Sequence, residues 1–142
     1  MTTTQEERNT AILKGAFDAW HQSKGTSTDH WLSIMADEVK LRSLAEGAKG
    51  LEFTTLRKGA GEIQQYLDGL LSQFEMIHYT VEHYTAQDDR VIAVGSTSWR
   101  NKTTGKVVDT AKADVTRFKD GKMIEFFEFY DTAMMLESCT PD

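Results

Sequence analysis

Two carboxylates, Asp114 and Glu128, are the side chains of this sequence best suited to acid–base chemistry. They lie in two runs rich in β-branched and aromatic residues. The runs are separated by Lys-Asp-Gly at 119–121, which is typical of a tight reversal because glycine adopts positive φ readily. The pattern predicts a long β-hairpin over residues 106–131. Two carboxyl groups whose surroundings separate their pKa values can act as acid and base in enolisation, dehydration or aldol-type ring closure.

The turn of this hairpin decides whether the two carboxylates share a face. A two-residue Asp-Gly turn at 120–121 directs Asp114 and Glu128 to opposite faces. A three-residue loop that begins one residue earlier, with a bulge at its glycine, places both on one face. Asp114 is then opposite Phe126, and Lys112 is opposite Glu128. The turn chemistry alone is compatible with both registers.

In the three-residue register the two acids have different surroundings. Phenylalanines around Asp114 remove it from water, which favours the neutral acid and raises its pKa. Glu128 pairs with Lys112, which favours the ionised carboxylate. The alternative interpretation is structural: Lys112 and Glu128 form a buried ion pair, and Asp114 is satisfied by Thr116 or by a backbone amide.

The opposite face of the hairpin is apolar and needs a cover. Its residues are Val107, Ala111, Ala113, Val115, Met123, Phe127 and Phe129. A chain of 142 residues has few helices to spare for this face. We therefore expect a second copy of the chain to cover it in a homodimer.

Length and composition indicate one globular domain over residues 1–142, with one proline and no low-complexity run. A net charge of −6 with scattered Lys and Arg argues against a nucleic-acid partner. The sequence contains no membrane span, and its first residues are polar, so we expect a cytoplasmic protein. The single cysteine excludes a disulfide within the chain.

The sequence lacks the common motifs for metals and cofactors. It has no phosphate-binding glycine loop, nucleophile elbow or metal-ligand cluster, so we expect neither a metal nor an organic cofactor. His78 and His83 differ by five positions and would face opposite sides of one strand. Either could line a pocket and act as a base, although an exposed or edge histidine is the commoner case.

The segments before the hairpin predict helices first and strands afterwards. Thr4 followed by Glu7 fits a capping box, and apolar residues then recur at helical spacing up to Gly25. The later segments are a short helix from residue 28, a strand from 39, a helix after 61, and strands near 76–86 and 90–101. Because no helix separates the last strands, this order predicts an α+β fold with an antiparallel sheet.

Four short motifs carry a resemblance to a known superfamily. They are Ala-Phe-Asp-Ala-Trp at 16–20, Met-Ala-Asp-Glu-Val at 35–39, Asp-Arg-Val at 89–91 and Arg-Phe-Lys-Asp-Gly-Lys at 117–122. In this order the chain resembles the nuclear-transport-factor-2-like superfamily, which includes ketosteroid isomerases, SnoaL-like polyketide cyclases, scytalone dehydratase and limonene epoxide hydrolase. The resemblance implies a single domain with a cone-shaped, curved antiparallel sheet wrapped around N-terminal helices, a cystatin-like α+β barrel. It also favours the three-residue register.

The catalytic positions of these relatives match the sequence only in part. Asp114 resembles the protonated aspartic acid that donates to the oxyanion in ketosteroid isomerases. Ser43 and Ala16 stand where those enzymes have their basic Asp and their Tyr. Glu128 matches one of the two catalytic carboxylates of the epoxide hydrolase, whose arginine falls at Gly95. The resemblance therefore implies a related pocket but neither of these two reactions.

We therefore expect a pocket for a small, hydrophobic, oxygen-bearing ligand, with Asp114 and Glu128 as catalytic residues. The leading hypothesis is a cofactor-independent isomerase, lyase or cyclase. The alternative is a non-catalytic ligand-binding or dimerisation module of the same fold. The residues expected to contact the substrate are Lys112, Ser43, His78, Trp99, Tyr130 and Phe126.

Overall fold

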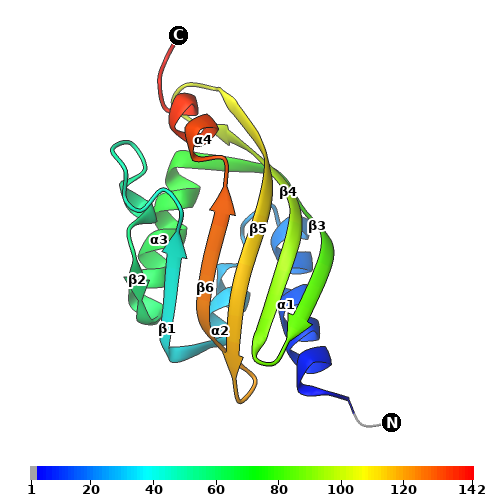
Figure 1. Cartoon of the computed structure of the whole chain (residues 1–142). Helices are drawn as coiled ribbons and strands as arrows, with labels where there is room; N and C mark the ends of the chain where they lie inside the picture. Colours follow the sequence, from blue (N-terminus) through cyan, green and yellow to red (C-terminus); the bar gives the residue numbers. More distant parts are fainter. Residues whose placement is uncertain (1–2) are drawn as a thin grey trace.

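The computed structural model describes residues 3–142 as helices packed against one curved sheet. The helices are α1 (Gln5–Gln22), α2 (Thr28–Ser33), α3 (Gly59–Gln73) and α4 (Thr132–Ser138), with a 3₁₀ turn, η1, at Glu52–Thr54. The strands are β1 (Met35–Ser43), β2 (Arg57–Lys58), β3 (Phe74–Gln87), β4 (Arg90–Asn101), β5 (Val107–Lys119) and β6 (Lys122–Tyr130). Figure 1 shows the sheet in front, with α1, α2 and α3 behind it. Among the described residues, no helix is long and apolar enough to cross a membrane.

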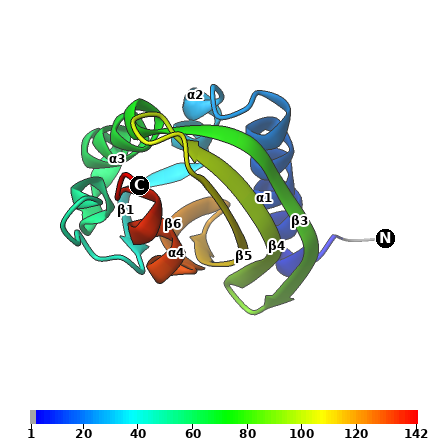
Figure 2. The same ribbon diagram turned by 90° about the horizontal axis from the view of Figure 1, so that it is seen from above.

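The strands pair in the order β2-β1-β6-β5-β4-β3. All neighbours are antiparallel except β1 and β6, which run parallel. The predicted antiparallel arrangement thus holds for the four long strands after α3. A parallel pair between β1 and β6 is possible because a long stretch of chain separates them. Seen from above, the sheet bends strongly, which confirms the predicted cone-shaped α+β fold (Figure 2).

Helix α1 begins and ends as the sequence predicts. Thr4 Oγ1 accepts the N–H of Glu7 at 3.1 Å, so Thr4 is the N-cap, while the Glu7 carboxylate accepts from the Thr4 hydroxyl at 3.0 Å in place of the backbone N–H of a full capping box. Gly25, with a φ of 87°, lets the chain leave the helix and donates its N–H to the carbonyl of Trp20 at 3.1 Å. The buried face, which packs against β3 and β4, consists of Asn9, Leu13, Ala16, Phe17 and Trp20.

The hairpin of β5 and β6 has a two-residue turn, so the predicted three-residue loop is wrong. Asp120 and Gly121 have φ values of 50° and 79°, and Lys119 pairs with Lys122. Positive φ at both central residues is the type I′ geometry, whose twist matches the twist of the flanking strands.

A bulge beside the turn nevertheless brings the two carboxylates to the same face. The register slips by one residue between Arg117 and Phe118, and Ile124 is the extra residue on β6. Beyond the bulge, Asp114 lies directly opposite Glu128. The extra residue compensates for the shorter turn. The shared face is therefore confirmed, although the cross-strand partners of Asp114 and Lys112 differ from those of either predicted register.

The bulge also overturns one assignment to the outer face. Met123 is fully buried opposite Phe118 on the inner face. The alternation of faces along β6 shifts by one at Ile124. Met123, which precedes it, therefore points inward instead of outward. The other six residues predicted for the outer face are exposed or half-buried.

Gly95 of β4 lies against the backbone of β3 at Thr80. A Cβ at this position would lie 1.9 Å from the carbonyl oxygen of Thr80. No larger residue fits this backbone. The position at which the epoxide hydrolase carries an arginine therefore cannot hold a side chain here.

Candidate functional site

A narrow cavity lies between the inner face of the sheet and the helices. The space inside it that a water-sized sphere can occupy is about 70 Å³. The aromatic part of its wall consists of Phe17, Trp20, Trp31, Phe53, Trp99 and Phe126. Its titratable side chains are Tyr66, Tyr79, Lys112, Glu128 and Tyr130.

Three charged side chains are buried together at the wall of this cavity. Lys112 Nζ lies 2.5 Å from Asp114 Oδ1 and 3.2 Å from Glu128 Oε2. The three side chains, which we call the charged cluster, are 9%, 2% and 10% exposed in that order. Lys112 and Asp114 occupy alternate positions on β5, and Glu128 is the cross-strand partner of Asp114 on β6. The register of the hairpin therefore brings the cluster together.

Hydroxyl groups from three other elements complete the hydrogen bonding of the carboxylates. Tyr79 of β3 donates to Asp114, and Tyr66 of α3 donates to Glu128. Ser43, at the end of β1, donates to Glu128 Oε1 at 2.7 Å. Because each carboxylate has a cation and at least one hydroxyl as donors, both can be buried as anions.

Burial and mutual charge shift the pKa values in the cluster. Burial raises the pKa of Asp114 above its ordinary 3.8, although the charge of Lys112 opposes this shift. Burial alone would lower the pKa of Lys112, but the two carboxylates raise it overall. Burial, followed by the neighbouring carboxylates, raises the pKa of both Tyr66 and Tyr79 well above 10.0. Lys112 is therefore a cation and both tyrosines are proton donors at neutral pH.

The members of the charged cluster differ in their access to the cavity. Lys112 and Glu128 line it, whereas Asp114 does not and bonds to Lys112 and Tyr79 instead. Lys112 Nζ also lies 5.0 Å from the ring centroid of Tyr79 and 5.9 Å from that of Phe126. A ligand in the cavity would therefore meet an ammonium group and a carboxylate set among aromatic rings.

The structure brings most of the predicted substrate-contacting residues together. Lys112, Trp99, Tyr130 and Phe126 line the cavity. Ser43 is fully buried and bonds to Glu128 without lining the cavity. His78 is not brought to the site, since its Nδ1 lies 3.2 Å from the hydroxyl of Thr80 and its side chain does not line the cavity.

Sequence reasoning missed Tyr66 and Tyr79, which hold the two carboxylates. Tyr66 lies on the apolar face of α3, where helical spacing indicates only core packing. Tyr79 follows a register shift in β3 between Met76 and His78, which breaks the alternation of faces. The sequence did offer one signal for Tyr66, which is a tyrosine among aliphatic residues. A buried phenol hydroxyl needs a hydrogen-bond partner, so such a tyrosine indicates a polar group nearby.

Comparisons with known proteins agree with this architecture. A family model described as a SnoaL-like domain matches residues 13–126. One similar structure is an NTF2-like protein from Burkholderia xenovorans LB400, with TM-score 0.81, 17% identity, and 97% of this chain and 100% of that chain covered. Another is TerC co-crystallised with polyporic acid, with TM-score 0.77, 16% identity, and coverages of 93% and 98%.

A third similar structure is a protein with a ketosteroid isomerase-like fold from Catenulispora acidiphila DSM 44928, in complex with trimethylamine. Its TM-score is 0.75 at 16% identity, and 99% of this chain and 96% of that chain are covered. Among curated proteins, none matches the sequence. The fold is thus that of the NTF2-like and ketosteroid isomerase-like proteins. Since the family model spans most of the sequence, the chain belongs to the SnoaL-like domain family.

Replacing Lys112 by methionine should destabilise the protein, because it leaves two buried carboxylates facing each other without a cation. We expect a loss of about 3–5 kcal/mol in the free energy of unfolding at pH 7, measured by urea denaturation. The pKa of Asp114 should rise further without Lys112. The native state then binds more protons than the unfolded state above pH 3.8, so stability falls as pH rises through this window. The loss should therefore be smaller near pH 4.

Lys119→Met, at the exposed hairpin turn, is the matched control and should change stability by no more than about 0.5 kcal/mol. A loss for Lys112→Met that is as small as the control, or that is the same at both pH values, would contradict the assigned charges.

Proposed function

We propose that this protein binds a small, mostly apolar, oxygen-bearing molecule in its cavity and transfers a proton on it. The reaction class is that of a cofactor-independent isomerase, lyase or cyclase. The observation that carries the proposal is the position of Lys112 and Glu128, which form a buried ammonium–carboxylate pair at the wall of an otherwise aromatic cavity. Titratable groups with desolvated surroundings in a cavity are characteristic of functional sites.

Glu128 is the proposed proton acceptor. Its Oε1 accepts hydrogen bonds from Ser43 and Tyr66, whereas Oε2 forms an ion pair with Lys112 at 3.2 Å and accepts no hydrogen bond from the described residues. A carboxylate oxygen has two lone pairs, so Oε2 retains one for a proton from a bound ligand. Abstraction of a proton from a carbon next to a carbonyl leaves the C–H electron pair in an enolate.

Lys112 is the proposed donor to the developing enolate oxygen. It lines the cavity, and as a cation it stabilises negative charge in surroundings of low polarity. Asp114, which bonds to Lys112 away from the cavity, holds this ammonium group in place and keeps it charged. We therefore assign the direct proton transfer to Glu128 and a positioning role to Asp114.

The charge of the cluster favours a neutral ligand. With all three groups ionised, it has two negative charges and one positive charge. A ligand carboxylate would meet this net negative charge in apolar surroundings, whereas a ketone can accept a hydrogen bond from Lys112. Ketones with an acidic C–H bond are therefore suitable probes.

A non-catalytic ligand-binding module is the second candidate. The observation that favours it is the closure of the cluster on itself, with both Asp114 oxygens engaged by Lys112 and Tyr79. In that case the cluster fixes the shape of the cavity and the ligand is bound without reaction. The two candidates differ in whether a bound ketone exchanges its acidic hydrogens.

The decisive experiment uses 2-tetralone in D₂O, with hydrogen exchange followed by NMR and binding followed by tryptophan fluorescence. Trp20, Trp31 and Trp99 line the cavity and should report occupancy. We expect the wild type to accelerate exchange, and Glu128→Gln to lower this acceleration about 100-fold while the probe still binds, because an amide cannot accept the proton.

The matched control is Glu125→Gln on the same strand. Glu125 pairs with Arg117 and does not line the cavity. The Glu125→Gln variant should therefore exchange the hydrogens of the probe at the wild-type rate. Binding without exchange in the wild type would reject catalysis and support the binding module. Failure of the probe to bind would argue against the proposed ligand class.

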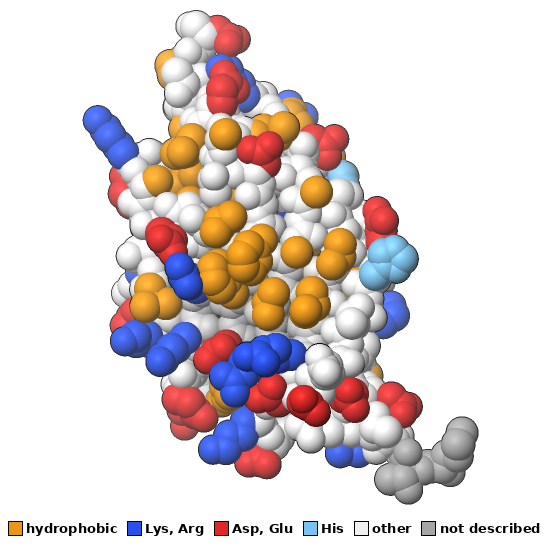
Figure 3. Space-filling model, in the orientation of Figure 1, with side chains coloured by type: hydrophobic (Ala, Val, Ile, Leu, Met, Phe, Trp, Pro, Cys, Tyr) orange, Lys and Arg blue, Asp and Glu red, His pale blue; other side chains and the backbone are white. Residues whose placement is uncertain are grey.

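We also propose that two copies associate through an outer patch formed by Ile92, Val94, Ala111, Ala113, Val115, Phe127 and Phe129. Figure 3 shows apolar side chains gathered over the middle of β4, β5 and β6, bordered by charged residues towards the hairpin turn. Val115 lies between Ile92 and Phe127 across neighbouring strands, and Val94 is 43% exposed. An exposed apolar patch of this kind is characteristic of an interface between subunits.

Phe129→Asp should convert the dimer to a monomer, because it places a charge within this apolar contact. Phe129 stacks on Phe127 with 4.2 Å between ring centroids, so the substitution also removes part of the contact surface. Light scattering at micromolar concentration measures the mass. Lys119→Asp, at the exposed turn, should remain dimeric. A wild type with the mass of one chain would overturn this assembly.

A further inference from the structure

We propose that Ser43 and Tyr130 form a proton relay that joins Glu128 to solvent near the loop after β1. The relay rests on the proposed function, because it serves a carboxylate that takes a proton from a ligand. Ser43 Oγ lies 2.7 Å from Glu128 Oε1 and 2.6 Å from the hydroxyl oxygen of Tyr130. The backbone N–H of Ala45 donates to the same tyrosine oxygen at 3.4 Å.

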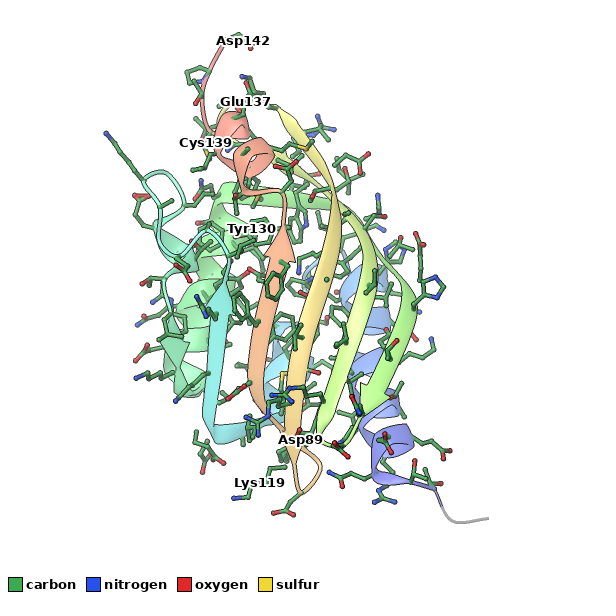
Figure 4. All side chains as sticks on the ribbon, in the orientation of Figure 1. Asp89, Lys119, Tyr130, Glu137, Cys139 and Asp142 are labelled. Carbon is green, nitrogen blue, oxygen red and sulfur yellow. The ribbon has the colours of Figure 1, made fainter. Side chains whose placement is uncertain are left out.

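The parallel pairing of β1 and β6 creates this chain of oxygens. Ser43 is the register partner of Glu128, and Tyr130 lies two residues further along β6 on the same face. Figure 4 labels Tyr130 at the end of β6, where the chain turns towards α4. The three side chains therefore come from two adjacent strand ends, which hold them in line.

The hydrogen bonds in this chain have one consistent direction while Glu128 is ionised. A carboxylate only accepts, so the Ser43 hydroxyl must donate its single proton to Glu128. Tyr130 must then donate to Ser43 Oγ, and its own oxygen accepts from Ala45. The order is Ala45 to Tyr130 to Ser43 to Glu128, with every hydroxyl proton used once.

The same chain can transfer a proton outward after Glu128 has been protonated by the ligand. The carboxyl group of Glu128 first turns so that its new O–H faces Ser43, and the hydroxyls of Ser43 and Tyr130 turn away from Glu128. Glu128 then gives its proton to Ser43 Oγ while the Ser43 proton moves to the Tyr130 oxygen and the Tyr130 proton moves to water. Each hydroxyl oxygen gains one O–H bond and loses one, and Glu128 returns to the carboxylate. The ligand keeps the electron pair of its broken C–H bond. Reversal of the same steps delivers a solvent proton.

Exposure increases along the chain. Ser43 is 0% and Glu128 8% exposed, whereas Tyr130 is half-buried. The loop above it begins with Leu44, which is 38% exposed, and reaches the exposed Glu46. Burial and the charge of Glu128 raise the pKa of Tyr130, so its hydroxyl stays protonated at neutral pH. Tyr130 lines both the cavity and a more open hollow that it forms with Ala111, Phe129 and Asp131, so this chain supplies a second path for the proton.

The test compares solvent exchange of 2-tetralone in Ser43→Ala, Ser43→Thr and Tyr130→Phe. Ser43→Ala and Tyr130→Phe should each lower exchange at least about tenfold, with the dissociation constant of the probe changed less than about twofold. Ser43→Thr keeps a hydroxyl and should restore most of the exchange. Tyr84→Phe, on a half-buried tyrosine of β3 that does not line the cavity, should exchange as the wild type does.

Tyr130→Phe separates a relay from simple support of Glu128. The bond from Ser43 to Glu128 survives in this variant, so support alone predicts wild-type exchange. Wild-type exchange in Tyr130→Phe would therefore overturn the relay while leaving the proposed function standing. Loss of exchange in both variants, with rescue by threonine, would support it.

A second measurement tests the connection even if the wild type does not exchange the probe. In protein labelled with ¹³C at the tyrosine Cζ, the Tyr130 signal, assigned with Tyr130→Phe, should move when Glu128 is protonated at low pH. The movement should become smaller in Ser43→Ala, where only the charge of Glu128 still acts on Tyr130, and should disappear in Glu128→Gln. A Tyr130 signal in the wild type that moves no differently from that of Ser43→Ala would overturn the relay.

Discussion

The burial of Lys112 between Asp114 and Glu128 is the interaction on which the rest of the site depends. Transfer of charged groups into apolar surroundings costs several kcal/mol per ion unless hydrogen bonds and opposite charges compensate. Here the compensation comes from β5 and β6 themselves, and from Tyr79, Tyr66 and Ser43 on β3, α3 and β1. The site therefore requires the hairpin register, the bend of the sheet and the position of α3 together.

The same interaction argues for a role beyond stability. Apolar residues of similar volume in place of a buried ion pair are often neutral or stabilising, so stability alone does not explain the cluster. Its position does distinguish it: Lys112 and Glu128 meet the cavity, while Asp114 raises the pKa of Lys112 from the side away from it. The aromatic wall provides binding surface, and the pair provides the polar groups that orient a ligand.

The sequence allowed the fold class, the capped first helix and the shared face of Asp114 and Glu128 to be predicted. The shared face was reached from the wrong turn, because a type I′ turn followed by a bulge has the same parity as a three-residue loop. A one-residue bulge at Ile124 leaves no distinct pattern, because apolar residues occur at consecutive positions, Met123 and Ile124 and then Phe126 and Phe127, along this strand. The face on which each carboxylate lies could thus be predicted, whereas their cross-strand partners could not.

The tyrosine donors and the role of Ser43 required the three-dimensional structure. Helical spacing placed Tyr66 in the core, and nothing local in the sequence indicates that its hydroxyl reaches a strand 62 residues away. Ser43 meets Glu128 only because β1 pairs in parallel with β6, which sequence order does not indicate. For His78 the prediction failed. It was expected to contact the substrate, but register shifts in β3 lie on either side of it and its side chain does not line the cavity.

The measurement that tests the account most directly is a pH titration of the Asp114 carboxyl carbon by NMR, assigned by comparison with Asp114→Asn. We expect a pKa above 3.8, because burial outweighs the attraction of Lys112. A value at or below 3.8 would mean that the carboxyl is hydrated, or more strongly paired than its burial allows. That result would contradict a desolvated cluster at the cavity wall.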